Sequence, residues 1–596
     1  MFHSADRSYC VGLYMDTKTK QFFTCCGANL PEGNVIYRFS GEETVNKKYG
    51  KQFLVQSYEI ESDSKTNLIA YLSSSEFTGI GKGTAKRIVK ELGVADTRAL
   101  VGGRSELIQN LSLSEKKKAQ LESVLRSTSE LAEVKRELMP YGVPEKLCKK
   151  LVSLYHEDAI AVVRRNPYIL SVISEKVGFR KADEIAMKMG IAPDANVRIA
   201  AGIREVLVQD TLRGHYYSLR STVTPQALHL LGISNMEKVD DTFEQLKQAS
   251  KIVATEKVVY SKSNFAVESG IAKLLLRLWK RGETKPLVNP MLLDHALSDA
   301  EKLLGFSLPD KQREAVQTAI LSPVTIITGG AGTGKTTILK AIQCIIDRHA
   351  KQFTYLFAAP TGKAARRISE STNSEASTIH RMLGLTEGSS EPMGLDADII
   401  ICDEASMIDA ALFHKLLQGM LMGKAHHLIL VGDVEQLPSV GAGAVLNDLI
   451  KSGQIPVVVL NTTYRQAKDS GIIENANLVR NGDTNIRFNN EDFIFVPCDS
   501  PEKIAEEVRK LYAQDPENTC VLSPRKGGIA GVNSLNSVLR ESVNPLSAGG
   551  TEKQYGEYIF RVDDKVMQIK NTDDGLSNGD TGIITAIVHD VRLVPN

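Results

Sequence analysis

A glycine-rich segment in the second half of the chain has the residues needed to hold phosphate groups. It reads Gly329-Gly330-Ala331-Gly332-Thr333-Gly334-Lys335-Thr336 and fits the pattern GxxxxGK(S/T). Glycines let backbone N–H groups face the phosphates, Lys335 adds a charge near the terminal phosphates, and the Thr336 hydroxyl suits Mg²⁺. These eight residues and Thr337 are candidate nucleotide ligands. Lys335 is also a candidate catalytic residue, and Thr336 a candidate metal ligand.

Two acidic residues end an apolar run further along the chain. Asp403 and Glu404 directly follow Ile399-Ile400-Ile401-Cys402, the pattern of a buried strand that delivers both acids at its end. At such a position Asp403 would hold Mg²⁺, and Glu404 would position and deprotonate the water that attacks a phosphate. An Asp-Glu pair is common by itself, and its place after the phosphate loop is what favours nucleotide hydrolysis.

Two more polar side chains have the chemistry to respond to a terminal phosphate. Gln436, within Gly432-Asp433-Val434-Glu435-Gln436-Leu437-Pro438, is a neutral amide able to sense a γ-phosphate. Arg465, within Thr463-Tyr464-Arg465-Gln466, is suited to spread the charge of a transition state. We interpret both as candidate catalytic residues, although Arg465 without its neighbours would fit a solvated surface residue.

Short apolar runs precede these polar segments and predict the elements that position them. Each run leads directly into a polar or glycine-rich segment, as parallel strands buried on both faces do; the runs are 324–328, 355–359, 399–402 and 428–431. Ligands of open α/β sheets bind at the carboxyl ends of strands. From about residue 295 onward, the sequence therefore predicts an α/β domain of the P-loop NTPase class, with a helix over 335–348.

Two segments upstream of this domain carry no chemistry of their own. Residues 1–70 read as short strands, for which an oligonucleotide-binding (OB)-like β-barrel and an unspecific β module are both open. Residues 191–290 mix helices with short β pieces and predict a helical or winged-helix-like adaptor. Within it, Trp279 fits a core residue better than a base-stacking platform, and 286–290 fits a linker into the next domain.

Residues 71–190 are helical, with recurring glycine turns. The turns lie at Gly79 and Gly81, at Gly142 and at Gly178. A glycine turn leaves free N–H groups beside a helix N-terminus, where they can meet a DNA phosphate, as in the helix-hairpin-helix motif. The alternative is a glycine-capped helix pair that packs and binds nothing. We take Gly79 and Gly81 as candidate DNA contacts.

Composition excludes several classes of protein. The 596 residues are 42% hydrophobic and 24% charged, which is typical of a folded chain of several domains. No apolar stretch is long enough for a membrane span, and the N-terminus lacks a signal-peptide pattern. The eight cysteines contain no CxxC pair, so we expect a reducing cytoplasm. The eleven histidines form no ligand-spaced cluster, and His426 and His427 fit the flank of a strand.

Together these segments resemble the superfamily 1 helicases, and among them the long RecD-like DNA helicases with an N-terminal extension. The phosphate loop is similar to their motif I, and Asp403-Glu404 to motif II. The segments around Gln436 and Arg465 are similar to motifs III and IV. Residues 522–527 and 579–582 resemble later segments of the second motor domain.

The resemblance also assigns residues that spacing alone does not. Gln312 stands where this family reads adenine with a glutamine. Thr361 and Lys363 lie in a segment similar to motif Ia, Ala359-Pro360-Thr361-Gly362-Lys363-Ala364-Ala365. His380 ends Ser377-Thr378-Ile379-His380, which resembles the family's step toward the DNA strand. Thr361, Lys363 and His380 are therefore candidate DNA contacts.

The resemblance implies tandem RecA-like domains, over 291–460 and 461–596, preceded by the OB-like and helix-hairpin-helix segments. It implies ATP and Mg²⁺ as cofactors and ATP-driven 5′→3′ movement along single-stranded DNA, with unwinding at single-strand/duplex junctions. No partner chain is required, although a subunit of a helicase–nuclease complex is an alternative.

Two departures from the family pattern affect these expectations. Motifs V and VI are not found before the sequence stops at Val594-Pro595-Asn596, so we expect an incomplete second RecA-like domain. Residues 385–395, near the family's strand-separating pin, are short and polar. The alternative to a motor is therefore a DNA-binding module with a nucleotide switch and no productive unwinding.

Overall fold

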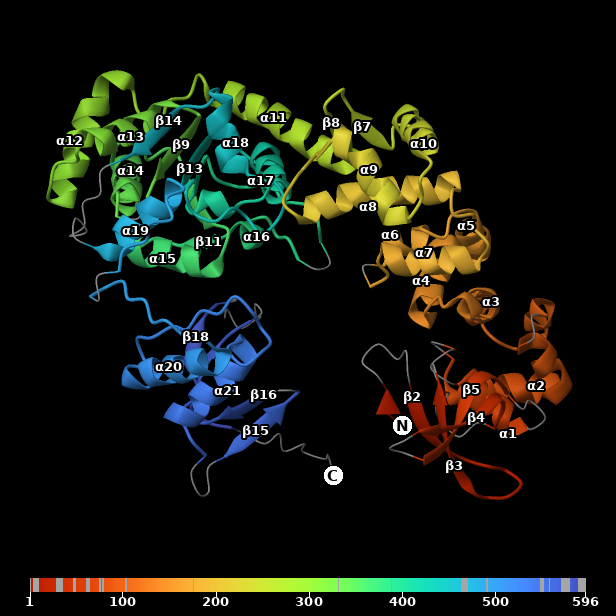
Figure 1. Ribbon diagram of the computed structural model, residues 1–596. Coiled ribbons are helices and arrows are strands. Elements are labelled where there is room, and N and C mark those ends of the chain that lie inside the picture. Colours follow the sequence, from red (N-terminus) through yellow and green to blue (C-terminus); the bar gives the residue numbers. More distant parts are fainter. Residues whose placement is uncertain are drawn as a thin grey trace. The chain divides into compact units, whose positions relative to one another are not determined.

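A computed structural model of the chain forms two compact units, residues 1–208 with 219–259 and residues 209–218 with 260–596 (Figure 1). We describe each unit by itself. The structure describes residues 2–3, 10–27, 30, 36–46, 50–60, 65–73, 77, 80–101, 104–174, 176–330, 332–386, 389–461, 470–488, 491–546, 551–556, 558–569 and 579–587. Among these residues, no helix is long and apolar enough to cross a membrane.

The first unit begins with a five-stranded sheet in the order β1-β2-β3-β5-β4. Strands β3 and β5 pair in parallel and the other neighbours are antiparallel. A small core formed by Cys10, Cys25, Leu30 and Val55 supports the sheet. Five strands agree in number with an OB-like module. The strands are β1 (Phe2–His3), β2 (Cys10–Met15), β3 (Phe22–Gly27), β4 (Tyr37–Asn46) and β5 (Gly50–Ile60).

Short helices separated by tight turns follow the sheet. Gly142, with a φ of 94°, lies between η2 and α4, where a left-handed conformation favours glycine. Gly178 caps the N-terminus of α7, and Phe179 and Ile185 of that helix are buried. The helices are α1 (Lys65–Leu72), α2 (Lys82–Val101), η1 (Ser105–Asn110), α3 (Glu115–Leu138), η2 (Met139–Tyr141), α4 (Glu145–Tyr155), η3 (His156–Asp158), α5 (Ala159–Arg165), α6 (Ile169–Ile173) and α7 (Phe179–Lys188).

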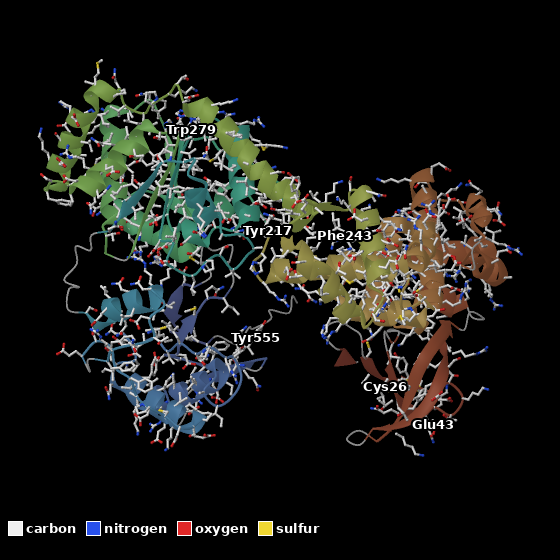
Figure 2. All side chains as sticks on the ribbon, turned by 45° about the horizontal axis from the view of Figure 1, so that its top comes forward. Cys26, Glu43, Tyr217, Phe243, Trp279 and Tyr555 are labelled. Carbon is white, nitrogen blue, oxygen red and sulfur yellow. The ribbon has the colours of Figure 1, made fainter. Side chains whose placement is uncertain are left out.

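A helix–strand–helix–helix–strand–strand order comes next, which is that of a winged-helix unit. Its three strands pair in the order β6-β8-β7. Phe243 of α10, labelled in Figure 2, is buried. The Arg220 guanidinium lies 3.7 Å from the Phe243 ring centroid. The elements are α8 (Asn196–Leu212), β6 (Ser218–Leu219), α9 (Arg220–Leu231), α10 (Met236–Gln248), β7 (Ile252–Ala254) and β8 (Val258–Ser261).

The second unit contains a six-stranded parallel sheet in the order β11-β10-β12-β13-β9-β14. Every residue of β9, β12 and β13 is buried, which explains their apolar runs and confirms the predicted α/β class. The strands are β9 (Val324–Gly329), β10 (Tyr355–Ala359), β11 (Ala376–Thr378), β12 (Ile399–Cys402), β13 (His427–Gly432) and β14 (Val457–Leu460).

Helices cover both faces of this sheet and form two apolar layers with it. One layer contains Leu297, Val316 and Ile342 from α12, α13 and α14, and the other contains Leu278 and Phe413 from α11 and α17. The helices are α11 (Lys262–Gly282), η4 (Pro290–Leu292), α12 (Leu293–Leu304), α13 (Asp310–Leu321), α14 (Lys335–His349), α15 (Gly362–Thr372), α16 (Ile379–Met382), η5 (Ala405–Met407), α17 (Ala410–Met422) and α18 (Val445–Ser452).

Helix α11 differs from the sequence-based division, which placed it in the adaptor. The Arg281 guanidinium donates hydrogen bonds to carbonyls of Met420, Leu421, Gly423 and Ala425, at the C-terminal end of α17. Trp279 packs against the same apolar layer, as expected of a core residue (Figure 2). Leu287 and Val288, in the segment expected to be a linker, are buried in the other layer. The packed unit therefore begins earlier than residue 291.

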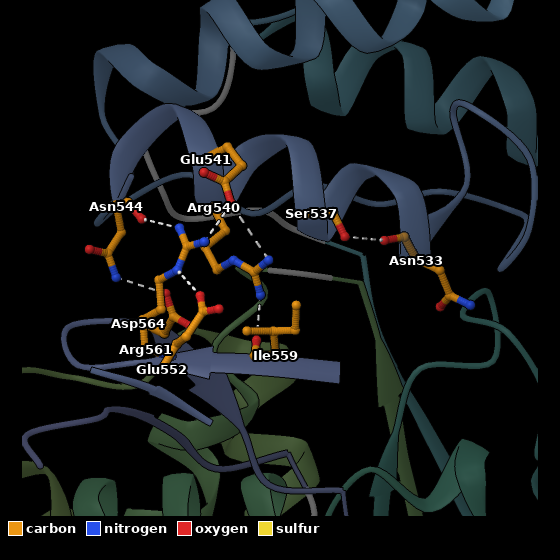
Figure 3. A network of polar contacts seen from close by, with 9 residues as sticks. All are labelled: Asn533, Ser537, Arg540, Glu541, Asn544, Glu552, Ile559, Arg561 and Asp564. Atoms are coloured by element: carbon orange, nitrogen blue, oxygen red, sulfur yellow. Dashed lines mark hydrogen bonds and ion pairs between the residues drawn. The ribbon is translucent and has the colours of Figure 1, made fainter. Parts of the chain in front are cut away.

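The C-terminal part contains three helices and two antiparallel strand pairs, β15–β16 and β17–β18. Arg561 of β16 joins β15 to the C-terminal end of α21, because its guanidinium donates to Glu552 (3.1 Å), Glu541 (2.7 Å) and the Asn544 carbonyl (2.9 Å) (Figure 3). The elements are α19 (Gly471–Arg480), α20 (Pro501–Gln514), α21 (Val532–Val543), β15 (Glu552–Tyr555), β16 (Tyr558–Arg561), β17 (Lys565–Met567) and β18 (Thr581–Ile583).

Candidate nucleotide-binding site

The parallel sheet brings the predicted motifs to one edge. The phosphate loop follows β9, the two acids follow β12, and the segment with Gln436 follows β13. The register pairs Gly432 with Thr328 and Leu430 with Cys402, so these three strands end side by side. Because all strands run in the same direction, their carboxyl ends form a common ligand edge.

The phosphate loop closes tightly on its own backbone. Gly334 has a φ of 89°, and a Cβ there would lie 2.2 Å from the amide nitrogen of Gln312. The Lys335 ammonium donates hydrogen bonds to the carbonyls of Gly329 and Gly330. The Thr333 hydroxyl donates to the Gly330 carbonyl at 2.9 Å. Lys335 thus lies at the loop it is expected to serve, whereas Ala331 falls outside the described residues.

Gln312 lies under the loop from the neighbouring helix α13. Its side chain is 4% exposed, and its Nε2 donates a hydrogen bond to the Thr333 carbonyl at 3.0 Å. The resemblance assigned Gln312 to adenine, and its carbonyl oxygen remains to accept from a base amino group. Gln312, the candidate base-reading residue, therefore also supports the phosphate loop directly.

Asp403 and Glu404 sit on a strained turn at the end of β12. Glu404 has a φ of 52°, uncommon for a residue other than glycine, and the Asp403 carboxylate accepts a hydrogen bond from its backbone N–H at 2.8 Å. Burial raises the pKa of Asp403. Burial and the neighbouring charge of Asp403 raise the pKa of Glu404, while Lys335 lowers it. Two crowded carboxyl groups near one ammonium favour a bound cation.

Two buried oxygens of this turn have no hydrogen-bond partner among the described residues. They are Oε2 of Glu404 and Oγ of Ser406. A buried polar atom without a partner costs free energy, so such atoms mark places for a ligand or water. The predicted metal ligands, the Thr336 hydroxyl and the Asp403 carboxylate, are oxygen donors, which Mg²⁺ prefers. The residues therefore fit the predicted metal.

The structure adds two residues that sequence reasoning missed. Arg367, on α15, lies close enough for its charge to lower the pKa of both Asp403 and Glu404. Asp433 is 6% exposed, and its charge raises the pKa of Glu404. Arg367 follows Lys363 by one helical turn, a spacing that could have revealed it. Gln436 itself is exposed.

The candidate DNA contacts have different surroundings. The Thr361 hydroxyl caps α15 by accepting from the Ala364 N–H at 3.3 Å, while Lys363 and His380 are exposed. Thr361 follows β10, and His380 follows β11, so they lie at the same sheet edge as the loop. Gly81 directly precedes α2. Gly79 and Arg465 lie outside the described residues.

In the helical region, a lysine side chain from the helix after Gly178 reaches the turn at Gly142. A Cβ at Gly142 would lie 3.9 Å from the Lys181 ammonium, which belongs to the helix after Gly178. The Lys181 ammonium also pairs with Glu184 at 3.1 Å. A glycine turn with a cation beside it is suited to a phosphate of a nucleic-acid backbone.

Replacing Gln312 with alanine should reduce the preference for ATP over GTP. Loss of one hydrogen bond to the base predicts an increase in KM for ATP of up to about tenfold. Steady-state kinetics with both nucleotides measure the preference. Lys311→Ala, an exposed neighbour on the same helix, is the matched control. An equal loss with ATP and GTP would limit Gln312 to support of the loop.

A parallel sheet with a phosphate loop and an acid pair at its carboxyl edge defines a P-loop nucleoside triphosphatase. Three family models match the chain: "AAA domain" over 307–494, "ATP-dependent RecD2 DNA helicase HHH domain" over 127–217 and "ATP-dependent RecD-like DNA helicase SH3 domain" over 535–594. Two of these models describe RecD-like DNA helicases, and the chain is similar to that family over the segments that they match.

Individual relatives agree with this assignment. The ATP-dependent RecD2 DNA helicase of Deinococcus radiodurans is 27% identical, over 93% of this chain and 78% of the relative. The RecBCD enzyme subunit RecD of Mycolicibacterium smegmatis is 30% identical, over 50% of this chain and 61% of the relative. The alignment with the crystal structure of Pif1 helicase from Candida albicans covers 47% of this chain and 69% of the Pif1 chain. The sequence identity is 20% and the TM-score is 0.29.

The family models also refine two sequence interpretations. The helix-hairpin-helix match contains the turns at Gly142 and Gly178 but not the one at Gly79 and Gly81. The SH3 match covers most of α21 and the two antiparallel strand pairs, a domain that the sequence patterns did not separate from the second motor domain.

Proposed function

We propose that this chain is an ATP-dependent DNA helicase that moves 5′→3′ along single-stranded DNA and unwinds duplex at junctions. The observation that carries the proposal is the shared edge of the sheet. Strands β12, β10 and β11 are neighbours, and they end at the acid pair, at the segment with Lys363 and at His380. Side chains suited to hydrolysis and to DNA therefore follow adjacent strands.

The chemistry proposed for the site is phosphoryl transfer to water. Lys335 stabilises negative charge on the terminal phosphates, and Glu404 accepts a proton from the attacking water. Gln436 senses the γ-phosphate, and Arg465 adds positive charge in the transition state. Bound Mg²⁺, held by Thr336 and Asp403, would neutralise phosphate charge.

Hydrolysis is coupled to DNA through the short connections at this edge. A change in the acid pair reaches β10 directly, because the Asp403 N–H donates to the Ala358 carbonyl at 3.0 Å. Thr361 and Lys363 begin the helix that follows β10 and are proposed to contact the DNA backbone. The turns at Gly81, Gly142 and Gly178 are proposed to hold additional phosphates, and no partner chain or compartment other than the cytoplasm is invoked.

Polarity is tested with duplexes that carry a single-stranded tail at only one end. We expect ATP-dependent strand separation with a 5′ tail and none with a 3′ tail. A motor that moves 5′→3′ travels toward the junction on a 5′ tail and away from it on a 3′ tail. A gel or fluorescence assay of strand release measures this. Unwinding from the 3′ tail alone would contradict the polarity. DNA-stimulated hydrolysis without unwinding of either substrate would favour the nucleotide switch.

A further inference from the structure

Two adjacent helices of the second unit bring together two imidazoles and a carboxylate. They lie at the C-terminal end of α14, and the phosphate loop lies at its N-terminal end. Helices α12 and α14 pack side by side (Figure 1). His295 and Asp299 lie one turn apart on α12, and His349 is the last residue of α14. One ligand atom from each residue lies within 4.8 Å of the other two.

A single carboxylate oxygen is shared by both rings. Oδ2 of Asp299 lies 3.2 Å from Nδ1 of His295 and 3.3 Å from Nε2 of His349. The other oxygen, Oδ1, accepts from the Lys302 ammonium at 3.2 Å. Nε2 of His349 is buried and makes no hydrogen bond of acceptable geometry to a described residue. Nε2 of His349 therefore lies near the Asp299 carboxylate without making a well-aligned hydrogen bond to it.

We propose that His295, Asp299 and His349 bind a divalent transition metal of the Zn²⁺ type, with water as the fourth ligand. Two imidazole nitrogens and one carboxylate oxygen form a donor set that suits Zn²⁺ rather than Mg²⁺. This site is separate from the phosphate loop and does not depend on the proposed helicase activity.

The distances already match the spacing of zinc ligands. Bonds of 2.0–2.2 Å in a tetrahedron separate ligand atoms by about 3.3–3.6 Å. Oδ2 of Asp299 lies 3.2 Å from Nδ1 of His295 and 3.3 Å from Nε2 of His349, close to this range. The two rings are nearly perpendicular, with centroids 5.7 Å apart, so both can point a nitrogen at one ion. The Lys302 side chain is 77% exposed and can turn away as a cation enters.

A bound metal would join α12 to the C-terminal end of α14. His349 and Asp299 are each 22% exposed and so are held by packing, while His295 is 71% exposed and leaves an entry path for the ion. Because the metal binds only where the two helices are packed, it should raise the free energy of unfolding of this unit.

The test is a Zn²⁺ titration of the full chain by isothermal titration calorimetry. We expect one equivalent of Zn²⁺ to bind to the original protein, and His295→Ala and Asp299→Asn each to weaken that binding by at least about tenfold. His215→Ala, which removes an exposed histidine elsewhere, is the matched control and should bind as the original protein does. Circular dichroism checks that each variant is folded.

Cobalt substitution distinguishes this site from the thiols of the chain. Co²⁺ at the proposed site should give ligand-field absorption without a thiolate charge-transfer band, and His295→Ala should remove that absorption. Zn²⁺ should raise the unfolding temperature of the original protein and of His215→Ala but not of His295→Ala. No stoichiometric binding, equal binding by all variants, or a thiolate band that persists in His295→Ala would each overturn the proposal.

Discussion

Replacing Lys335 with alanine abolishes DNA-stimulated ATP hydrolysis, with an expected loss of at least about a hundredfold in turnover. The ammonium lies within hydrogen-bonding distance of two carbonyls of the phosphate loop, so it is placed to bind a phosphate that enters this loop. Without it, the charge that develops during transfer has no cation from the loop. A coupled-enzyme assay with saturating single-stranded DNA measures the rate.

Lys351→Ala is the control for this prediction. Lys351 is exposed and lies just beyond the other end of α14, so its replacement removes one charge without touching the loop. We expect the turnover of this variant to match that of the original chain. Turnover of Lys335→Ala at the original rate would reject the assignment of the phosphate loop.

Replacing Glu404 with glutamine should stop hydrolysis while ATP still binds. The amide keeps the size of the side chain but cannot accept a proton from water, and loss of a general base predicts a fall in turnover of about 10²–10⁴-fold. Single-turnover hydrolysis measures the chemical step, and a fluorescent ATP analogue measures binding. The two variants thus separate charge stabilisation from proton transfer.

Glu370→Gln provides a matched change on the exposed part of α15, where Glu370 pairs with Arg366 at 3.1 Å. It should leave turnover unchanged. Glu404→Gln with unchanged turnover would assign the proton acceptor to another group at this edge, such as the buried Asp433, whose charge raises the pKa of Glu404.

The six-stranded parallel sheet was predictable because its central strands are buried on both faces. Burial of both faces forces a run such as Ile399–Cys402 to be wholly apolar, and the parallel direction places the polar segment after each run at one edge. Strand ends therefore told where Lys335 and the two acids would meet. Arg367 was missed because its approach to them depends on how α15 is rotated, which alternation of apolar residues does not specify.

The domain boundary at α11 and the proposed metal site could be recognised only from the three-dimensional structure. Helix α11 has an apolar face, but the sequence does not say which unit covers it. The hydrogen bonds from Arg281 to carbonyls at the C-terminal end of α17 show that α11 packs in the second unit. His349 is remote in sequence from His295 and Asp299, so no ligand spacing appears along the chain. The SH3 match consists of short, largely exposed strands, whose patterns are weak.

The bond from Gln312 to the Thr333 carbonyl links the residue that the resemblance assigns to adenine with the loop that carries Lys335. A nucleotide whose base makes no hydrogen bond to the Gln312 amide should displace the phosphate loop that carries Lys335. Selectivity should then show itself as slower chemistry after binding as well as weaker capture, so a misfit triphosphate would occupy the motor and leave it idling.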